Sequence, residues 1–488
     1  MDIFKELKLN IKEIISRLAK KQHITINNEL FNNLVIKLSP KQQHGEIYTN
    51  ATLILAKILS YPINEIGQLL INELIHMHYI EKATMSSPGF INIIIKKSIW
   101  AQTLDHIISK KIQFGNAHIN KNTILKCTTT FSTYPPYISL RGVVFMNALA
   151  SILIECGYKT TKQYYITYTK TYILALIHAV KYYISLLVIN QPITKNTHNI
   201  FLIKIGQQII DDSGGDVSPL SEIDLFLYIK HYILNNIHNN VLEQLYSLNI
   251  HCPIKLCEIA EPYTKSHSGD IPNLDNILKY VNKKHHHIPD TITITCKNNT
   301  NCLHTLYVSN QIVSNNTENN IHIPPDDMIL IFLSQKYNMP LYINFNQIFD
   351  KSRNNVIFYI KYTYNLVCYI LHHTKNSTPH SHINLSKLDI CYSHYSKEEI
   401  CLIHLLSLWP QLLEEVSISY DVHRIVLYLQ KLSIYFYNIQ YKDNNKNLPF
   451  IYNNDINLTV TKLALIRALK VIIESGLSII GINVVATI

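Results

Sequence analysis

Glycine is scarce in this chain, and the shortage limits where a ligand can approach the backbone. The 488 residues include 12 glycines, whereas average usage would give about 34. Glycine permits left-handed turns and lets phosphate groups come close to the main chain. A glycine-rich loop that cradles nucleotide phosphates is therefore not expected.

Charged residues and paired cysteines are also few. Asp, Glu, Lys and Arg make up 16% of the chain, against about 25% in an average domain. The nine cysteines are odd in number and form no CxxC pair, so no zinc site or other metal site is expected. A reducing compartment is the default for such a chain, and we expect a cytoplasmic protein.

Signals for export or membrane insertion are missing as well. The first 20 residues form a charged amphipathic pattern, which does not match a signal peptide. The apolar stretch at 355–371 is shorter than the ~20 residues that a membrane span needs, and Asn and Lys interrupt it. The sequence therefore predicts a core helix there and no membrane partner.

Apolar residues and basic charge are what the chain does contain. Apolar residues make up 47% and the formal net charge is +10, and this length suggests two to four domains. The lysines fit two explanations, a codon bias toward A and T or a polyanionic partner. Charge alone does not choose between them.

Periodicity predicts an α/β fold followed by an all-α region. Residues 1–115 read as a small α/β unit, with a helix at the start, helices near 51–59 and 62–76, and a strand at 89–96. A strand, loop, helix and strand follow at 120–175, with Gly157 as the residue that ends the helix. Helices and polar loops alternate over 176–290, and two weak strands occupy 291–325. Helical periodicity dominates from about 326, and the histidines in 283–287 are expected in solvent rather than on a metal.

The loop and helix at 130–153 keep the frame of a nucleotide-binding corner without its usual residues. A polar loop that leads into a helix N-terminus attracts phosphate groups. This loop carries Pro135 and Pro136, has no glycine before Gly142 and contains no histidine.

Motifs in three regions resemble the arginyl-tRNA synthetase family. "HGEIYTNATLILAK" is similar to the family's G-D-x-x-T-N-x-A stretch, and "SPGFINIII" is similar to its G-P-G-F-I-N signature. Near the C-terminus, "VHRIVLYLQKLSIYFYNI" and "KLALIRALKVIIESGLSIIGI" resemble the anticodon-binding helical bundle. The resemblance implies an N-terminal domain for the tRNA elbow over 1–115. It further implies a reduced Rossmann-like catalytic-type domain over 116–344 and an anticodon-binding-type bundle over 345–488.

The catalytic motifs of that family are degraded here. When Arg141-Gly142 is placed on the family's Arg-Gly, its HIGH tetrapeptide falls on Pro136, Tyr137, Ile138 and Ser139. The family's KMSK loop falls on "NQIVSNNTENN", which has no lysine. The arginine-binding strand positions carry Thr128 and Thr130, and "KQYYITYTKTYI" places Tyr165 and Tyr168 where the substrate pocket would be. The helix Asp has become Asn147.

The resemblance also implies residues that would contact tRNA. They are Asn50, Lys57, Phe90, Asn92, Tyr362, His423 and Arg424. Some of these positions have an equally simple structural role. Arg141 fits either a phosphate contact or a structural role, in which it caps the helix entry or pairs with a carboxylate. Lys57 fits a solvated helix face, and His423 fits a structural hydrogen bond.

These patterns leave two functional hypotheses from different classes. One is a tRNA-binding descendant of the family, expected to be a monomer, that has lost the ATP-dependent attachment of arginine. The other is a working arginine–tRNA ligase with divergent signatures, which would still use ATP and Mg²⁺ and no covalently bound cofactor. A protein-interaction role, or a decaying gene product, is a further alternative. The catalytic motifs are lost more completely than the terminal ones, which favours the first hypothesis.

Overall fold

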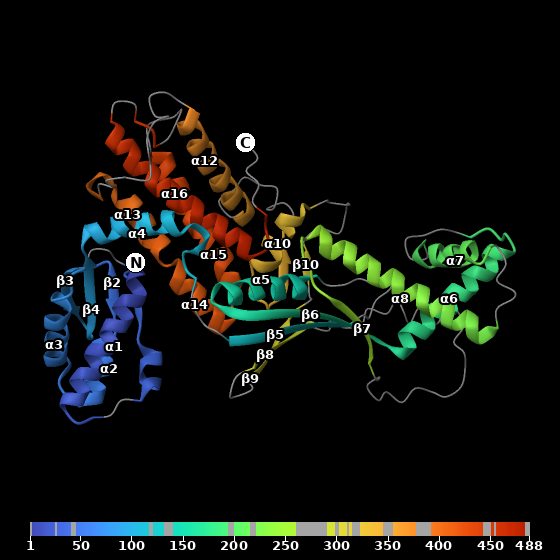
Figure 1. The fold of residues 1–488 in the computed structure, drawn as a ribbon, viewed down its shortest axis with the longest axis horizontal. Helices are drawn as coiled ribbons and strands as arrows, with labels where there is room; N and C mark the ends of the chain where they lie inside the picture. The colour runs from blue at the N-terminus through green and yellow to red at the C-terminus, as the bar shows by residue number, and fades with distance from the viewer. Residues whose placement is uncertain are drawn as a thin grey trace.

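A computed structural model gives the fold, and it describes most of the chain. The described residues are 2–24, 27–40, 45–116, 121–130, 140–193, 200–214, 221–259, 290–297, 302–309, 312–314, 323–344, 355–376, 392–442, 450–452 and 455–483. Figure 1 shows an elongated molecule in which an N-terminal unit, a helical bundle and a helical arm are arranged around a central sheet.

The N-terminal unit is a small sheet covered by helices. Its four strands run in the order β1-β2-β4-β3, and each neighbouring pair is antiparallel. The helices predicted near 51–59 and 62–76 and the strand predicted at 89–96 are confirmed as α2, α3 and β4, while α4 was not predicted. The elements are α1 (Ile3–Lys21), η1 (Asn28–Asn33), β1 (Ile36–Leu38), β2 (Ile47–Thr49), α2 (Ala51–Leu59), α3 (Ile63–Ile75), β3 (Ile80–Ser86), β4 (Phe90–Ile95), α4 (Lys97–Lys110) and η3 (Lys111–Gln113).

A five-stranded sheet forms the centre of the molecule, in the order β7-β6-β5-β8-β9. The expected strand–helix–strand unit is β5 (Lys121–Thr130), α5 (Arg141–Glu155) and β6 (Tyr158–Thr169), with β5 and β6 parallel. Gly157 follows the helix with φ +85°, as predicted for the residue that ends it. The remaining strands are β7 (Ile254–Ile259), β8 (Asp290–Lys297) and β9 (Cys302–Val308).

Among the described residues, this sheet contains one parallel half of a doubly wound fold, formed by β5, β6 and β7. In such a fold, the strand on the far side of the first strand begins a second parallel half. That place beside β5 is taken by β8, which runs antiparallel to β5 and pairs with β9 as a hairpin. A two-stranded parallel pair, β10 (Ile312–Ser314) and β11 (Leu341–Ile343), flanks helix α10 (Pro325–Leu333) outside this sheet.

Three helices form an arm between β6 and β7. They are α6 (Lys170–Val188), α7 (Ile200–Asp212) and α8 (Glu222–Ser247), and in Figure 1 they extend away from the sheet on the side opposite the N-terminal unit. The buried residues of α8 recur every four residues, as expected of an amphipathic helix: Ile229, Ile233, Ile237, Val241 and Leu245. By length and composition α6 would suffice to cross a membrane, but half of its most apolar window is buried within the protein.

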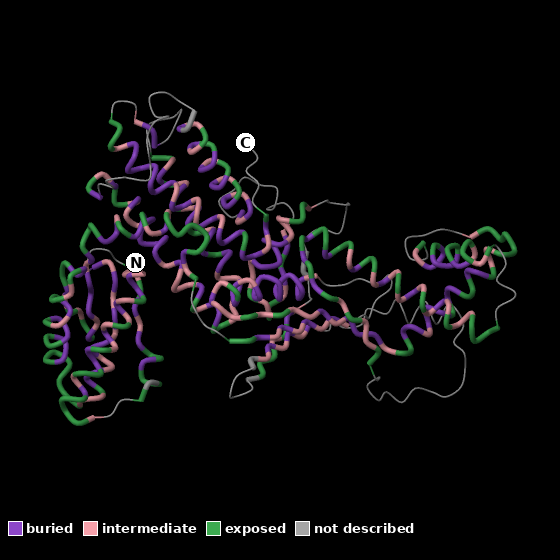
Figure 2. Tube along the Cα trace, in the orientation of Figure 1, coloured by how far each residue is buried: buried purple, intermediate pink, exposed green. Residues whose placement is uncertain are grey.

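The C-terminal region is a helical bundle, as the 3.6-residue periodicity predicts. Figure 2 shows that its interior residues are buried, and α16 is buried along most of its length. An exposed face remains on the outer helices. The bundle comprises α12 (Val356–Asn376), η5 (Tyr392–His394), α13 (Lys397–Ser407), α14 (Trp409–Ser419), α15 (His423–Lys442) and α16 (Ile456–Ile479). Helix α5 packs against α14 and α16, which joins the central sheet to the bundle.

Candidate functional site

The candidate site is the corner where β5 and β6 end and α5 begins. Carboxyl ends of parallel strands and a helix N-terminus meet there, which is where open α/β sheets bind ligands. The HIGH-type positions Pro136, Tyr137, Ile138 and Ser139 lie outside the described residues. So do residues 310, 311 and 315–320 of the KMSK-type segment and the histidines in 283–287. The rest of the corner is described.

Arg141, the first residue of α5, is a buried structural residue. It is 2% exposed, and its guanidinium donates hydrogen bonds to backbone carbonyls that follow β9 and flank α10. The acceptors are Ser309 O at 2.9 Å, Phe332 O at 3.4 Å, Lys336 O at 3.0 Å and Met339 O at 2.7 Å. Burial lowers its pKa to about 10. These hydrogen bonds fit a structural role for Arg141, and a phosphate contact by this guanidinium would require the network to break.

Asp290 lies against the first turn of α5. The residue is fully buried, and a Cβ built on Gly142 would lie 2.3 Å from its Oδ2. Gly142 is therefore needed for space, because any side chain would collide with the carboxyl group. The N-terminus of a helix attracts anions, and here the chain's own acidic group lies at that place. Sequence reasoning missed Asp290, since nothing local marks the first residue of β8 as a partner of α5.

Hydroxyl groups lie at the ends of β5 and β6. Thr130 and Thr167 are cross-strand neighbours whose Oγ1 atoms are 2.9 Å apart. Thr128 and Tyr165 are also cross-strand neighbours, and the Tyr165 hydroxyl donates to Gln163 Oε1 at 3.2 Å.

The four residues predicted to bind substrate do not share one face of the sheet. Thr128, Thr130 and Tyr165 lie on the same face, and all three are partly exposed. Tyr168 is buried on the opposite face, where burial raises its pKa. The structure therefore brings three of them together and not the fourth.

Most of the N-terminal residues expected to contact tRNA have structural partners. The Asn50 side chain accepts from Val35 N at 2.8 Å and donates to Asn33 O at 2.9 Å, which fixes the start of α2. Asn92 is 7% exposed and donates to Ser86 Oγ at 3.0 Å. Phe90 packs edge-on against Tyr48. Lys57 is exposed on α2 and is the member of this set that is open to a phosphate.

The three expected residues of the bundle are partly exposed and lie on two helices. Tyr362 stacks on Phe358 and donates to Gln440 Oε1 at 3.0 Å. Arg424 forms an ion pair with Glu415. Burial lowers the pKa of His423, and its buried Nδ1 has no hydrogen-bond partner among the described residues. The structural hydrogen bond expected of His423 is therefore not made at that nitrogen.

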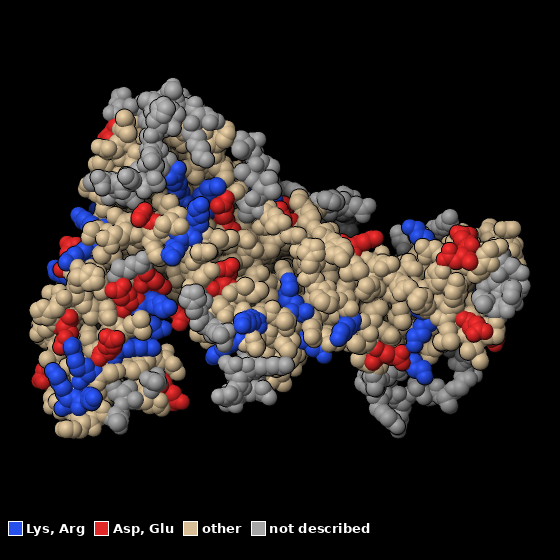
Figure 3. Space-filling view, in the orientation of Figure 1, with Lys and Arg blue, Asp and Glu red and all other residues tan. Residues whose placement is uncertain are grey.

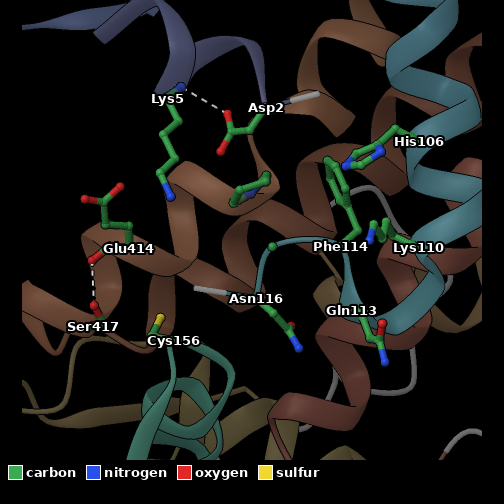
Figure 4. A pocket seen from close by; sticks show the side chains of 12 residues that line it. Asp2, Lys5, His106, Lys110, Gln113, Phe114, Asn116, Cys156, Glu414 and Ser417 are labelled. Carbon is green, nitrogen blue, oxygen red and sulfur yellow. Dashed lines mark hydrogen bonds between the residues drawn. The ribbon is translucent and has the colours of Figure 1, made fainter. Parts of the chain in front are cut away.

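Two cavities lie at the junctions between units, away from the corner. One, of about 420 Å³, is lined by α1, α4, η3 and α14 and by Cys156 at the far end of α5. Figure 4 shows Asp2, Lys5 and Glu414 around it, and Asp2 accepts from the backbone N of Lys5. Burial raises the pKa of Asp2. This cavity lies where the N-terminal unit, the bundle and the end of α5 meet, and burial raises the pKa of the Cys156 thiol in its lining to about 11.

The second cavity, of about 720 Å³, lies between η3, α12 and α16. Its lining is largely apolar, with four basic or histidine side chains beside the apolar ones: Lys111, His372, Arg467 and Lys470. Figure 3 shows basic side chains gathered over α4 and α16. Glu474 is the acidic residue of the lining, and it pairs with Lys470 at 2.9 Å. A polyanion is the ligand that these basic side chains suit. Among the residues that the structure describes, no group of three His, Cys, Asp or Glu side chains is arranged to hold a metal ion.

Comparison with known proteins gives a consistent result over the length of the chain. A model of the arginyl tRNA synthetase N terminal domain matches residues 1–95, and a model of the DALR anticodon binding domain matches residues 360–488. The arginine–tRNA ligase of Orientia tsutsugamushi is 25% identical over 595 residues of alignment, which cover 99% of this chain and 100% of that protein. That of Rickettsia prowazekii is 24% identical and covers 100% of both chains. Each alignment is longer than the 488 residues of this chain, so these relatives contain segments that are missing here.

Solved structures agree with this result at the level of fold. The arginyl-tRNA synthetase of Plasmodium falciparum superposes with a TM-score of 0.61 at 13% identity, over 100% of this chain and 99% of that one. The Thermus thermophilus enzyme gives a TM-score of 0.60 at 12% identity, over 99% and 100% of the two chains. The α/β unit, the central sheet and the helical bundle thus follow one known architecture.

Proposed function

We propose that this chain, which belongs to the arginyl-tRNA synthetase family, binds tRNA but does not attach arginine to it. The family's reaction joins the arginine carboxylate to the α-phosphate of ATP and then transfers arginine to the tRNA. Phosphoryl chemistry of this kind depends on positioning and on cations or N–H groups aimed at developing negative charge. The proposal therefore depends on what occupies the corner at α5.

The observation that carries the proposal is Asp290 at the first turn of α5. Its buried carboxyl group lies against Gly142, where the helix N-terminus would otherwise favour a phosphate. A carboxylate and a phosphate at one helix N-terminus repel each other, and both would be partly desolvated. The described residues of this corner therefore do not suit ATP.

A second observation at this corner, the set of hydrogen bonds made by Arg141, supports the same conclusion. Arg141 uses its guanidinium to bind four backbone carbonyls, so it cannot reach a phosphate without breaking that network. The sequence also lacks both histidines of the HIGH motif and any lysine in the KMSK-type segment. Loss of one such donor costs about 10²–10³ in rate, and loss of several from one site is expected to cost more.

Binding to tRNA is supported by the units that flank the sheet. The N-terminal domain and the anticodon-binding domain both match their family models. Lys57 is exposed on the first of these, and Arg467 and Lys470 of the second line the cavity between η3, α12 and α16. Together with a net charge of +10, these residues supply attraction for a phosphate backbone.

The test is ATP–pyrophosphate exchange with arginine, with and without arginine tRNA, together with direct tRNA titration. We expect no exchange above that of a mock purification from cells without the gene, and we expect measurable tRNA binding at low salt. Exchange that scales with the amount of this protein would overturn the loss of activity. It would support the alternative of a divergent ligase that uses ATP and Mg²⁺, which the end-to-end alignment with ligases favours.

A further inference from the structure

One face of the central sheet has no covering layer among the described residues. On the face toward α5, strand residues such as Leu125, Cys127, Ile166, Ile292 and Ile294 are fully buried. On the other face, every described strand residue except Thr167 is at least partly exposed. The reason is topological. The second parallel half of a doubly wound fold supplies the helices for the second face, and the hairpin β8–β9 supplies none.

The open face carries hydroxyl, basic and aromatic side chains and no acidic one among its described positions. Register places one row across all five strands, from β9 to β7: Tyr307, Thr291, Thr128, Tyr165 and Lys255. The next row contributes Thr305, Thr293, Lys126 and Gln163. Figure 3 shows basic side chains over β5 and β6. The face is therefore positive and hydroxyl-rich, and an anionic partner fits it better than a neutral one.

The two tyrosines of this row are separated by three strand spacings, which is roughly 14 Å. Tyr307 is 58% exposed. Tyr165 is partly exposed, with Lys126 Nζ 3.9 Å and Lys255 Nζ 5.7 Å from its ring centroid. Exposed aromatic rings on a sheet, with cations beside them, are how proteins stack unpaired bases while neutralising the backbone.

We propose that this open sheet face, defined by the rows through Tyr307–Lys255 and Thr305–Gln163, binds unpaired RNA. A base stacks on Tyr307, Lys126 and Lys255 contact phosphates, and the threonine hydroxyls lie within reach of ribose hydroxyls. Paired RNA is a poor ligand for this surface because its bases are already stacked within the helix. This site is separate from the tRNA-facing units of the proposed function, and neither proposal depends on the other.

The experiment is fluorescence anisotropy of a labelled 12-nucleotide oligouridine with the full chain at low salt, next to a duplex of the same length. We expect the unpaired strand to bind more tightly. Tyr307→Ala should weaken binding at least about fivefold, since stacking on one aromatic ring contributes about 1–3 kcal/mol. Tyr307→Phe should keep it, because the ring is retained. Lys126→Ala should lower the slope of log binding constant against log salt concentration by about 0.7, because one phosphate contact is lost.

The matched control is Tyr246→Ala, which removes a tyrosine of similar exposure, 56%, from α8. It should leave oligouridine binding unchanged, and thermal melting should show all variants folded. The inference is overturned if the wild-type chain does not bind oligouridine, or if Tyr307→Ala binds like wild type. It is also overturned if Tyr307→Ala abolishes self-association measured by sedimentation and leaves oligouridine binding intact, because the face would then serve a second copy. Titration of the same variants with whole tRNA tests the proposed function separately. If tRNA binds and oligouridine does not, only the inference about the sheet face fails.

Discussion

Gly142 and Asp290 pack against each other at the candidate corner. A side chain at position 142 has no room, because its Cβ would lie 2.3 Å from Asp290 Oδ2 and 2.7 Å from Asp290 Cβ. The pair brings α5 against the first residue of β8. The same contact places an acidic group beside the first turn of α5.

Gly142→Ala is expected to destabilise the protein by about 1–3 kcal/mol, the usual cost of overpacking a filled site. The matched control is Gly206→Ala in α7, where the new Cβ would be 3.4 Å from the nearest atom. That substitution should be neutral or stabilising, since Ala favours a helix over Gly by about 1 kcal/mol. Urea unfolding of the wild-type protein and of the two variants gives their free energies of unfolding. Equal stability of the two variants would contradict the close contact at Gly142.

Arg141 is expected to stabilise the fold rather than to take part in a reaction. Arg141→Ala leaves four carbonyls without their donor, and an orphaned buried acceptor costs about 1–3 kcal/mol. We expect a loss of at least about 2 kcal/mol in the free energy of unfolding. Arg424→Ala is the control, because Arg424 is a partly exposed arginine in an ion pair, and such surface pairs contribute about 0–1 kcal/mol. A loss no larger than that of the control would show that the carbonyl network is not stabilising.

At the scale of elements, the junction between the N-terminal unit and α13 buries a histidine. The His404 ring packs on Trp100 of α4 with centroids 4.3 Å apart, and its Nε2 is 3.6 Å from Glu46 Oε1. Glu46 accepts from Trp100 Nε1 at 3.0 Å and from Ile95 N at 2.9 Å. Burial lowers the pKa of His404 to about 4 and raises the pKa of Glu46. The junction therefore favours a neutral histidine.

This junction predicts a pH-dependent stability. The folded pKa of His404 is below its unfolded value of 6.5, so the unfolded state takes up the proton first as pH falls. Stability is then complete above about pH 6.5 and is lost toward pH 4. Glu46, with a raised pKa, contributes in the opposite direction, so a comparison with His404→Phe isolates the histidine. Between pH 7 and 5, that variant should lose roughly 2 kcal/mol less than wild type.

Urea unfolding at a series of pH values measures this difference. The variant keeps an aromatic ring on Trp100, so packing is largely retained. His76→Phe, at an exposed position at the end of α3, should leave the profile unchanged. If His404→Phe follows the wild-type pH dependence, then His404 is not held neutral at the junction.

Considered as a whole molecule, the chain is elongated and carries a net charge of +10, and its N-terminal unit and helical bundle both match family domain models. If tRNA binding is dominated by phosphates, affinity falls by about 0.7–0.9 log units per contact for each tenfold rise in salt. We expect arginine tRNA and an unrelated tRNA to bind alike, because phosphate contacts carry no sequence information. Base-specific contacts would add a contribution that salt does not remove.

Titration of both tRNAs at two salt concentrations measures this behaviour. Arg467→Ala in the cavity between η3, α12 and α16 should lower the slope of log affinity against log salt concentration by about 0.7–0.9, the contribution of one phosphate contact. Lys181→Ala on the arm helix α6 should not change that slope. A strong preference for arginine tRNA at high salt would contradict backbone-dominated binding and would favour a working ligase.

Local sequence was sufficient for much of this protein. Periodicity and end signals predicted α2, α3, β4, the β5–α5–β6 unit with Gly157, and the C-terminal bundle. Those elements depend on contacts within a few residues, or on one apolar face, so the pattern that predicts them lies in residues close together in the sequence. The motifs at 45–57, 88–92 and 423–477 were likewise enough to indicate the family.

The tertiary structure alone decided what the candidate corner contains. Arg141 allowed two roles in the sequence, and its carbonyl partners lie 168 to 198 residues away. The position of Asp290 against Gly142, the antiparallel run of β8 beside β5 and the open face of the sheet are likewise non-local. Pairing between distant strands leaves little mark on either strand's own residues. The sequence by itself therefore determined many of the elements and indicated the family, and long-range packing determined which groups meet at the site.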